Sequence, residues 1–145
     1  MSDIQIVIPK ESDIEEMVAW GKSNTELRIS ENDPFYAPET LKEWVKNPRN
    51  DTILIAKDGK KLVGMCLVHH MRDWAYCAVL FVVKEYRGKG IGRKLTDTAT
   101  MALKKTGVEL FGLLVEEQNE DSQKFYEKIG LKKGPVFRWM DKKLS

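Results

Sequence analysis

The stretch from Leu80 to Thr100 limits the folds and functions open to this chain more than any other. It reads as an apolar strand, a tight turn and a helix that begins near Ile91. The turn holds the glycines Gly88, Gly90 and Gly92 and the cations Arg87, Lys89, Arg93 and Lys94. Backbone N–H groups, the positive end of a helix dipole and basic side chains all favour a bound anion, most often a phosphate. The stretch therefore predicts a phosphate-binding loop.

Two common phosphate loops do not fit the spacing of this turn. A Walker A loop needs Lys-Ser or Lys-Thr after its last glycine, whereas Arg-Lys follows Gly92. A dinucleotide-binding fingerprint needs a third glycine three residues after the second, and Arg93 holds that position after Gly90. What remains is Arg87-x-x-Gly90-x-Gly92 after the apolar run 80–83. A charged turn without a ligand is the simpler alternative.

Composition places the chain among ordinary globular proteins. It has 145 residues, of which 42% are hydrophobic and 32% charged, with a formal net charge of +2. This length predicts a single domain over 1–145. The small net charge predicts no direct binding to nucleic acid or to a membrane surface. No apolar run approaches the ~20 residues that span a bilayer, and the first residues lack the apolar core of a signal peptide, so we expect a cytoplasmic protein.

The rest of the chain alternates strand and helix patterns. Strands are expected over 4–8, 52–57, 61–69, 75–83, 109–115 and 135–140. Helices are expected from Ser12 to Gly21, from Thr40 to Asn47, from Ile91 to Gly107 and from Asn119 to Gly130. This order predicts an α/β fold with a mixed sheet. A right-handed crossover puts 75–83 and 109–115 side by side in parallel, and the apolarity of 75–83 makes it a central strand.

The chain has two cysteines, Cys66 and Cys77, and their spacing fits no metal site. Both lie in apolar, strand-like runs. In a reducing compartment we expect two buried thiols rather than a disulfide. We therefore expect no metal.

A second motif follows the phosphate loop at a natural helix-plus-strand separation. It consists of Leu113-x-Val115, then Asn119, then the run from Phe125 to Leu131, FYEKIGL. Together the two motifs resemble those of the GCN5-related N-acetyltransferases (GNAT), and the resemblance covers nearly the whole chain. It implies a mixed, mostly antiparallel, twisted sheet flanked by helices, in which a central bulged strand splays from the next parallel strand. It also implies acetyl-CoA as co-substrate.

The resemblance further implies which residues hold the cofactor. The bulge is expected near 80–82, where free backbone groups would pair with pantetheine and a backbone N–H, of Val82, would stabilise the thioester oxygen. Arg87 is expected to support the loop, Asn119 to contact the pantetheine arm and Tyr126 to be the general acid to the leaving sulfur. The implied cofactor-binding set is Leu80, Phe81, Val82, Arg87, Gly88, Lys89, Gly90, Ile91, Gly92, Arg93, Asn119 and Tyr126.

The chain departs from a common family pattern at the general base. Several members carry a glutamate at one of three strand positions, which here are Ala78, Val79 and Leu114. Glu116 becomes the first candidate, because it would share a face with Leu114 if the strand continued. Glu117, His69, His70 and a water held by backbone carbonyls remain open.

The acceptor pocket is expected between the region 23–44 and the start of the central strand at Trp74 and Tyr76. Acidic and aromatic residues there hint at a cationic amine: a polyamine, an amino acid, an aminoglycoside or a protein amino group. Two other functions remain open, a non-catalytic acyl-CoA sensor and a nucleotide-binding module. Dimers are common in the family, so a homodimer is also expected as an alternative to a monomer.

Overall fold

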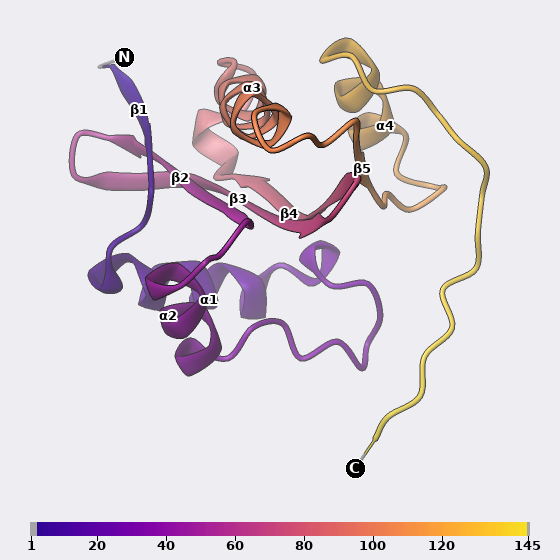
Figure 1. The fold of residues 1–145 in the computed structure, drawn as a ribbon, viewed down its shortest axis with the longest axis horizontal. Helices are drawn as coiled ribbons and strands as arrows, with labels where there is room; N and C mark the ends of the chain where they lie inside the picture. The colour runs from indigo at the N-terminus through magenta and orange to yellow at the C-terminus, as the bar shows by residue number, and fades with distance from the viewer. Residues whose placement is uncertain (1–2, 145) are drawn as a thin grey trace.

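The computed structural model describes residues 3–144 as a twisted sheet with helices on both faces (Figure 1). Its strands are β1 (Ile4–Val7), β2 (Thr52–Asp58), β3 (Lys61–Met71), β4 (Trp74–Val82) and β5 (Leu110–Leu113). Its helices are α1 (Ile14–Ser23), α2 (Pro38–Lys46), α3 (Ile91–Lys104) and α4 (Glu120–Lys128). α1 and α2 cover one face of the sheet, and α3 and α4 lie on the other.

The strands of the sheet follow one another in sequence order. Each neighbouring pair is antiparallel except β4 and β5, which are parallel. The predicted crossover through α3 is therefore confirmed. β2 and β3 form a hairpin, and Gly59 in its turn has a φ of +63°. The resulting fold is the mixed, bulged and splayed sheet that the resemblance implies.

Each face of the sheet has its own core. On the α3 face, Leu95, Ala99 and Leu103 of the helix pack against strand residues such as Val63 and Cys66. On the other face, Ile14 and Met17 of α1 and Leu41 of α2 pack against Ile55, Met65 and Leu67. A fully buried aliphatic side chain of this size contributes about 1.5 to 3 kcal/mol. The helical spacing of the apolar residues therefore fixes both helix layers to the sheet.

Both N-terminal helices begin elsewhere than the sequence suggests. The carboxylate of Asp13 accepts a hydrogen bond from the Lys10 backbone N–H at 2.8 Å, and α1 begins at Ile14, so the helix start expected at Ser12 is wrong. α1 also continues through Gly21 to Ser23. α2 begins at Pro38 rather than at Thr40, because a proline at the first helical position has a suitable φ and lacks only an N–H that would be unpaired there.

The strand expected over 135–140 is wrong. Within the described chain, residues 129–144 form neither helix nor strand, and Val136, Phe137 and Met140 are 69%, 80% and 83% exposed. The apolar residues alone do not make a strand, which needs a neighbouring edge to pair with. β5 is also shorter than expected, and Leu110 at its start is exposed. Figure 1 shows the C-terminal segment running along the outside of the molecule.

Both cysteines are buried and free, as predicted. A hydrogen bond with Cys77, followed by burial, raises the pKa of the Cys66 thiol well above its ordinary value. Among the helices of residues 3–144, none has both the length and the apolar character to cross a membrane.

Candidate active site

The site is built where β4 and β5 separate. β5 pairs with β4 only from Trp74 to Cys77, and its last residue, Leu113, lies opposite Cys77. β4 continues to Val82. The register against β3 shifts at this point, so that Ala78 is the extra, bulged residue. The bulge thus lies just before the region 80–82 where it was expected, and the second half of β4 faces a gap on its β5 side.

Backbone groups of β4 point into this gap. The Val83 N–H donates to the Val63 carbonyl at 3.0 Å. Because partners alternate along an antiparallel pair, the N–H and C=O of Val82 and Leu80 point away from β3, toward the open side. Arg87 Nε donates to the Val82 carbonyl at 2.8 Å, and its guanidinium lies 5.7 Å from the centre of the Phe81 ring. Arg87 thus fixes the end of β4.

The glycine turn leads directly into α3. Gly88 and Gly90 have φ values of +78° and +83°, a region that side chains rarely adopt, and a β-carbon added at either would meet no described atom within 4 Å. Gly90 is the N-cap of α3, so the first N–H groups of the helix are open to a ligand. This geometry suits an anion at the end of β4.

The other three cations of the turn, beside Arg87, have different contacts. Lys89 lies 5.6 Å from the centre of the Tyr86 ring. Arg93 donates to the Lys128 carbonyl at 2.9 Å and so connects α3 with α4. Lys94 donates to the Ile4 carbonyl at 3.1 Å, on the side of β1. The expectation that Lys94 adds charge to the turn is therefore wrong.

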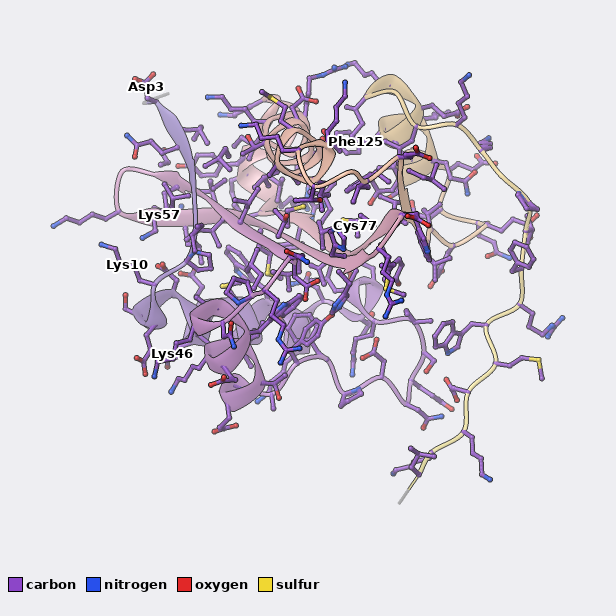
Figure 2. The ribbon with its side chains drawn as sticks, viewed as in Figure 1. Asp3, Lys10, Lys46, Lys57, Cys77 and Phe125 are labelled. Carbon is purple, nitrogen blue, oxygen red and sulfur yellow. The ribbon has the colours of Figure 1, made fainter. Side chains whose placement is uncertain are left out.

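α4 brings Asn119 and Tyr126 to the same end of the sheet. The Asn119 side chain caps the helix by accepting a hydrogen bond from the Ser122 N–H at 3.1 Å. Burial, followed by the charges of Cys77 and Cys66, raises the pKa of Tyr126 to about 12. The phenol is therefore protonated near neutral pH and lies close to Cys77, where the strands separate. Figure 2 shows Cys77 in the sheet and Phe125 on α4 above it.

Glu116 lies beyond the end of β5. The strand stops at Leu113, so the continued strand that would have put Glu116 on the face of Leu114 is absent from the described structure. Its side chain is exposed, and its backbone carbonyl accepts hydrogen bonds from the Asn119 N–H and from Gln123 Nε2. Its role as base stays a prediction.

A group of aromatic residues lies on the α1/α2 face beside the start of β4. We call Tyr36, Trp44, His69 and Tyr76 the aromatic wall. Trp44 stacks on His69 with ring centroids 4.7 Å apart and an angle of 11°, and the rings of His69 and Tyr76 are nearly parallel at 6.4 Å. Asp51, which precedes β2, joins the wall through a hydrogen bond from Trp44 Nε1 at 2.8 Å. Sequence reasoning missed Asp51, because no local motif marks it.

No group of three or more His, Cys, Asp or Glu side chains in the described residues could hold a metal ion. The site is thus a bulged strand that splays from its neighbour, with a glycine turn at a helix N-terminus. The sequence model of the acetyltransferase (GNAT) family matches residues 14–131. The chain belongs to this family.

Curated relatives and solved structures agree with this assignment. An acetyltransferase of Agrobacterium fabrum is 28% identical over 130 residues, which is 83% of this chain and 93% of the relative. A putative ribosomal protein bS18 alanine N-acetyltransferase of Bacillus subtilis is 30% identical, over 71% of this chain and 68% of the relative. The PaiA N-acetyltransferase of Thermoplasma acidophilum, solved with coenzyme A, has the same fold, with a TM-score of 0.78, 23% identity and 90% of each chain covered. This GNAT protein is therefore an N-acetyltransferase that uses acetyl-CoA.

Proposed function

We propose that this acetyltransferase moves the acetyl group of acetyl-CoA directly to a cationic amine, with Tyr126 as general acid. The observation that carries the proposal is the gap beside β4, which opens opposite Cys77 with the glycine turn at one end. Tyr126 approaches the gap from the face of α3 and α4. The aromatic wall lies on the opposite face. Donor and acceptor can thus meet from the two sides of the sheet.

The gap suits the acetyl-CoA donor. The N–H and C=O of Leu80 and the N–H of Val82 can pair with the amides of the pantetheine arm, with Phe81 between them, as a neighbouring strand would, whereas the Val82 C=O is bonded to Arg87. The turn 88–93 can wrap the pyrophosphate with the backbone of Gly88, Lys89, Gly90, Ile91, Gly92 and Arg93. Asn119, which caps the start of α4, would contact the arm, and Arg87, which is bonded to the Val82 carbonyl, would support the turn.

The chemistry assigns a task to two groups. The amine nitrogen attacks the thioester carbonyl, and the oxygen that gains negative charge is stabilised by the Val82 N–H, which β3 leaves free. The C–S bond then breaks, and Tyr126 donates its proton to the sulfur. The nitrogen releases its surplus proton to solvent as the amide forms, and the Tyr126 phenolate takes up a proton from solvent. A phenol with a pKa of about 12 is fully protonated at neutral pH, as a proton donor must be.

The acceptor is a cationic amine, of a small molecule or of a protein. Aromatic faces attract cations, and the aromatic wall presents several of them near two carboxylates. Asp33 and Asp51 are close enough to Tyr36 that their negative charges raise its pKa, after the larger effect of burial. A polyamine, an aminoglycoside and a peptide N-terminus all carry the required charge.

A second copy of the chain is the partner we propose for the C-terminal segment 132–144. Its apolar residues are exposed, and so are Leu114 and Val115 beyond β5. The segment is mostly basic, whereas the loop after β5 and the first turn of α4 are acidic. The basic residues are Lys132, Lys133, Arg138, Lys142 and Lys143, and the acidic ones are Glu116 and Glu117 of the loop and Glu120 and Asp121 of α4. Opposite charges beside exposed apolar surface favour a symmetric dimer in which each segment lies on its partner.

The missing strand glutamates give one specific alternative, an acyl-CoA sensor without turnover. The deciding experiment has two stages. Thermal unfolding is first measured with acetyl-CoA, coenzyme A and ATP; a ligand at ~100 times its Kd stabilises a fold by about 2.7 kcal/mol. Acetylation of spermidine, kanamycin and a peptide N-terminus is then followed by mass spectrometry. Stabilisation by acetyl-CoA but not ATP, with an acetylated amine, supports the enzyme. Stabilisation by acetyl-CoA without any acetylated product supports the sensor. Stronger stabilisation by ATP than by acetyl-CoA would contradict both functions.

A further inference from the structure

His69 occupies the centre of a polar chain within the aromatic wall. Tyr36 Oη lies 2.8 Å from His69 Nε2, and Asp51 Oδ2 lies 4.0 Å from His69 Nδ1. One tautomer of His69 suits both neighbours. Its unprotonated Nε2 accepts a hydrogen bond from the Tyr36 hydroxyl, and its Nδ1–H faces Asp51. Tyr36 therefore supplies a hydroxyl group, and His69 an imidazole that can take the hydroxyl proton. Asp51 supplies a carboxylate that stabilises the resulting positive charge.

Asp51 is held firmly enough to orient the imidazole. Its Oδ1 accepts a hydrogen bond from the His70 backbone N–H at 2.6 Å, and its Oδ2 accepts one from Trp44 Nε1 at 2.8 Å. The Trp44 ring also stacks on His69. Charge-assisted bonds to fixed donors hold a carboxylate in position. Trp44 and Asp51 are thus positioning residues for His69.

The chain of groups ends beside the point where donor and acceptor meet. His69 pairs with Tyr76 of β4, two residues before the bulge at Ala78. Burial, followed by the charges of Tyr76, Asp33, Asp51 and Cys77, raises the pKa of Tyr36 well above its ordinary value. Cys77 also contributes to the raised pKa of Tyr126, on the other face of the sheet. Tyr36 is thus connected through His69 to the part of β4 beside the bulge, and Tyr126 lies near Cys77 on the other face.

We propose that Tyr36 accepts the proton of the attacking ammonium and passes its own proton to His69. The ammonium N–H bond breaks as a new O–H bond forms on Tyr36. The original Tyr36 O–H bond breaks as an N–H bond forms at His69 Nε2, and Asp51 stabilises the imidazolium. His69, whose side chain is 34% exposed, then returns this proton to water. The inference rests on the proposed function, because it supplies the base that amine acetylation needs.

This chain of groups serves better than the carboxylate candidates. A primary amine has a pKa near 10, so roughly one molecule in a thousand is neutral at pH 7 and a base near the site matters. The described strands at the gap, WAYCAVLFV and LFGL, carry no carboxylate, and Glu116 is exposed beyond the end of β5. The groups that face His69 are Tyr36 from the loop before α2, Trp44 from α2, Asp51 before β2 and Tyr76 from β4.

The test compares the pH dependence of variants. Tyr36→Phe and His69→Gln remove the two proton carriers. His70→Gln is the matched control, because His70 bonds Thr106 Oγ1 at 3.0 Å and its backbone bond to Asp51 survives the change. Glu116→Gln tests the rival base. For each protein, kcat is measured between pH 6 and pH 9 with the probe, among spermidine, kanamycin and a free peptide N-terminus, that the unaltered enzyme acetylates fastest. Thermal stabilisation by acetyl-CoA shows whether each variant is folded.

The expected deficit of Tyr36→Phe and His69→Gln is about 10²-fold at pH 7, the lower range for general base catalysis. It shrinks as the pH rises toward the pKa of the amine, because more of the amine is then already neutral and has no ammonium proton for Tyr36 to remove. His70→Gln matches the unaltered enzyme throughout. A deficit that stays constant with pH, no deficit at all, or the same pH-dependent deficit in Glu116→Gln alone would overturn the relay and leave the proposed function standing. An unaltered enzyme that binds acetyl-CoA but acetylates no probe overturns both.

Discussion

The ring of Phe125 lies directly against Gly92. A β-carbon added at Gly92 would meet Phe125 Cζ at 2.6 Å, closer than real side-chain contacts allow. Gly92 stands in the first turn of α3, and Phe125 precedes Tyr126 in α4. The third glycine of the turn therefore lets α4 approach the phosphate loop, and with it the proposed general acid.

Replacement of this glycine should disturb activity more than stability. In Gly92→Ala the added methyl group displaces the Phe125 ring, with an overpacking cost of about 1 to 3 kcal/mol that a gain in helix propensity of roughly 0.5 to 1 kcal/mol partly offsets. We expect a lower kcat, because Tyr126 moves with Phe125. The measurement is kcat together with denaturant unfolding. Gly134→Ala is the control, since a β-carbon there meets nothing within 4 Å. Recovery of kcat in the double variant Gly92→Ala/Phe125→Leu would attribute the loss to this contact.

Tyr126→Phe separates catalysis from binding. The variant keeps the ring that packs beside Phe125, with ring centroids 5.4 Å apart, and removes only the proton donor. We expect kcat to fall by roughly 10²-fold while the thermal stabilisation by acetyl-CoA persists. Substrate kinetics and thermal unfolding on the same preparation provide the check. Unchanged kcat would remove Tyr126 from the mechanism.

The raised pKa of Tyr126 also makes the fold sensitive to alkali. The phenol has a pKa of about 12 in the folded protein and about 10 when unfolded, so above pH 10 the unfolded chain loses its proton first. The contribution of the protonated Tyr126 to the free energy of unfolding is fully present below pH 10 and is lost as the pH rises toward 12. Between pH 9 and pH 11 the loss is roughly 1 kcal/mol. Urea unfolding should show that Tyr126→Phe loses less stability over this interval than the unaltered protein does. An equal loss would contradict the assignment.

The proposed dimer predicts an effect of changes in the C-terminal segment. Phe137 is 80% exposed in the described chain, so Phe137→Ser costs a monomer almost nothing. In a dimer that buries this segment, the same change removes apolar contact area and should shift the equilibrium to monomers. Sedimentation equilibrium of the two proteins measures this directly. Lys22→Ser, at an exposed position of α1 outside the segment, is the control. A monomer at every concentration would refute the dimer.

Features encoded by neighbouring residues were predictable from the sequence. The strand, glycine turn and helix between Leu80 and Thr100 follow from local apolarity and backbone freedom, and Asn119 caps α4 as its position suggests. The parallel crossover follows from chain handedness. The displaced bulge at Ala78 could not be read in the same way, because it depends on how β4 and β3 match in register.

Features that depend on distant pairing were missed or wrong. The apolar residues of 135–140 resemble a strand, but a strand exists only where an edge accepts its hydrogen bonds. Asp51, Tyr36 and His69 come from three separate segments, and only the packing of α2 on the sheet brings them together. The proton relay therefore became apparent only in the structure, although His69 was among the alternatives.

A last prediction concerns the support of Tyr36. The neighbouring Phe35 is buried and has a φ of +54°, and a β-carbon at Gly21 of α1 would meet its Cδ2 and Cε2 at 2.3 Å. Because the contact includes the rigid base of the ring, Gly21→Ala should displace the loop that carries Tyr36, at a cost of about 1 to 3 kcal/mol. We expect kcat to fall while stabilisation by acetyl-CoA is retained, since the donor lies on the other face of the sheet. Partial recovery in Gly21→Ala/Phe35→Ala would attribute the loss to this contact, whereas an equal loss of acetyl-CoA binding would mean that the whole sheet is disturbed.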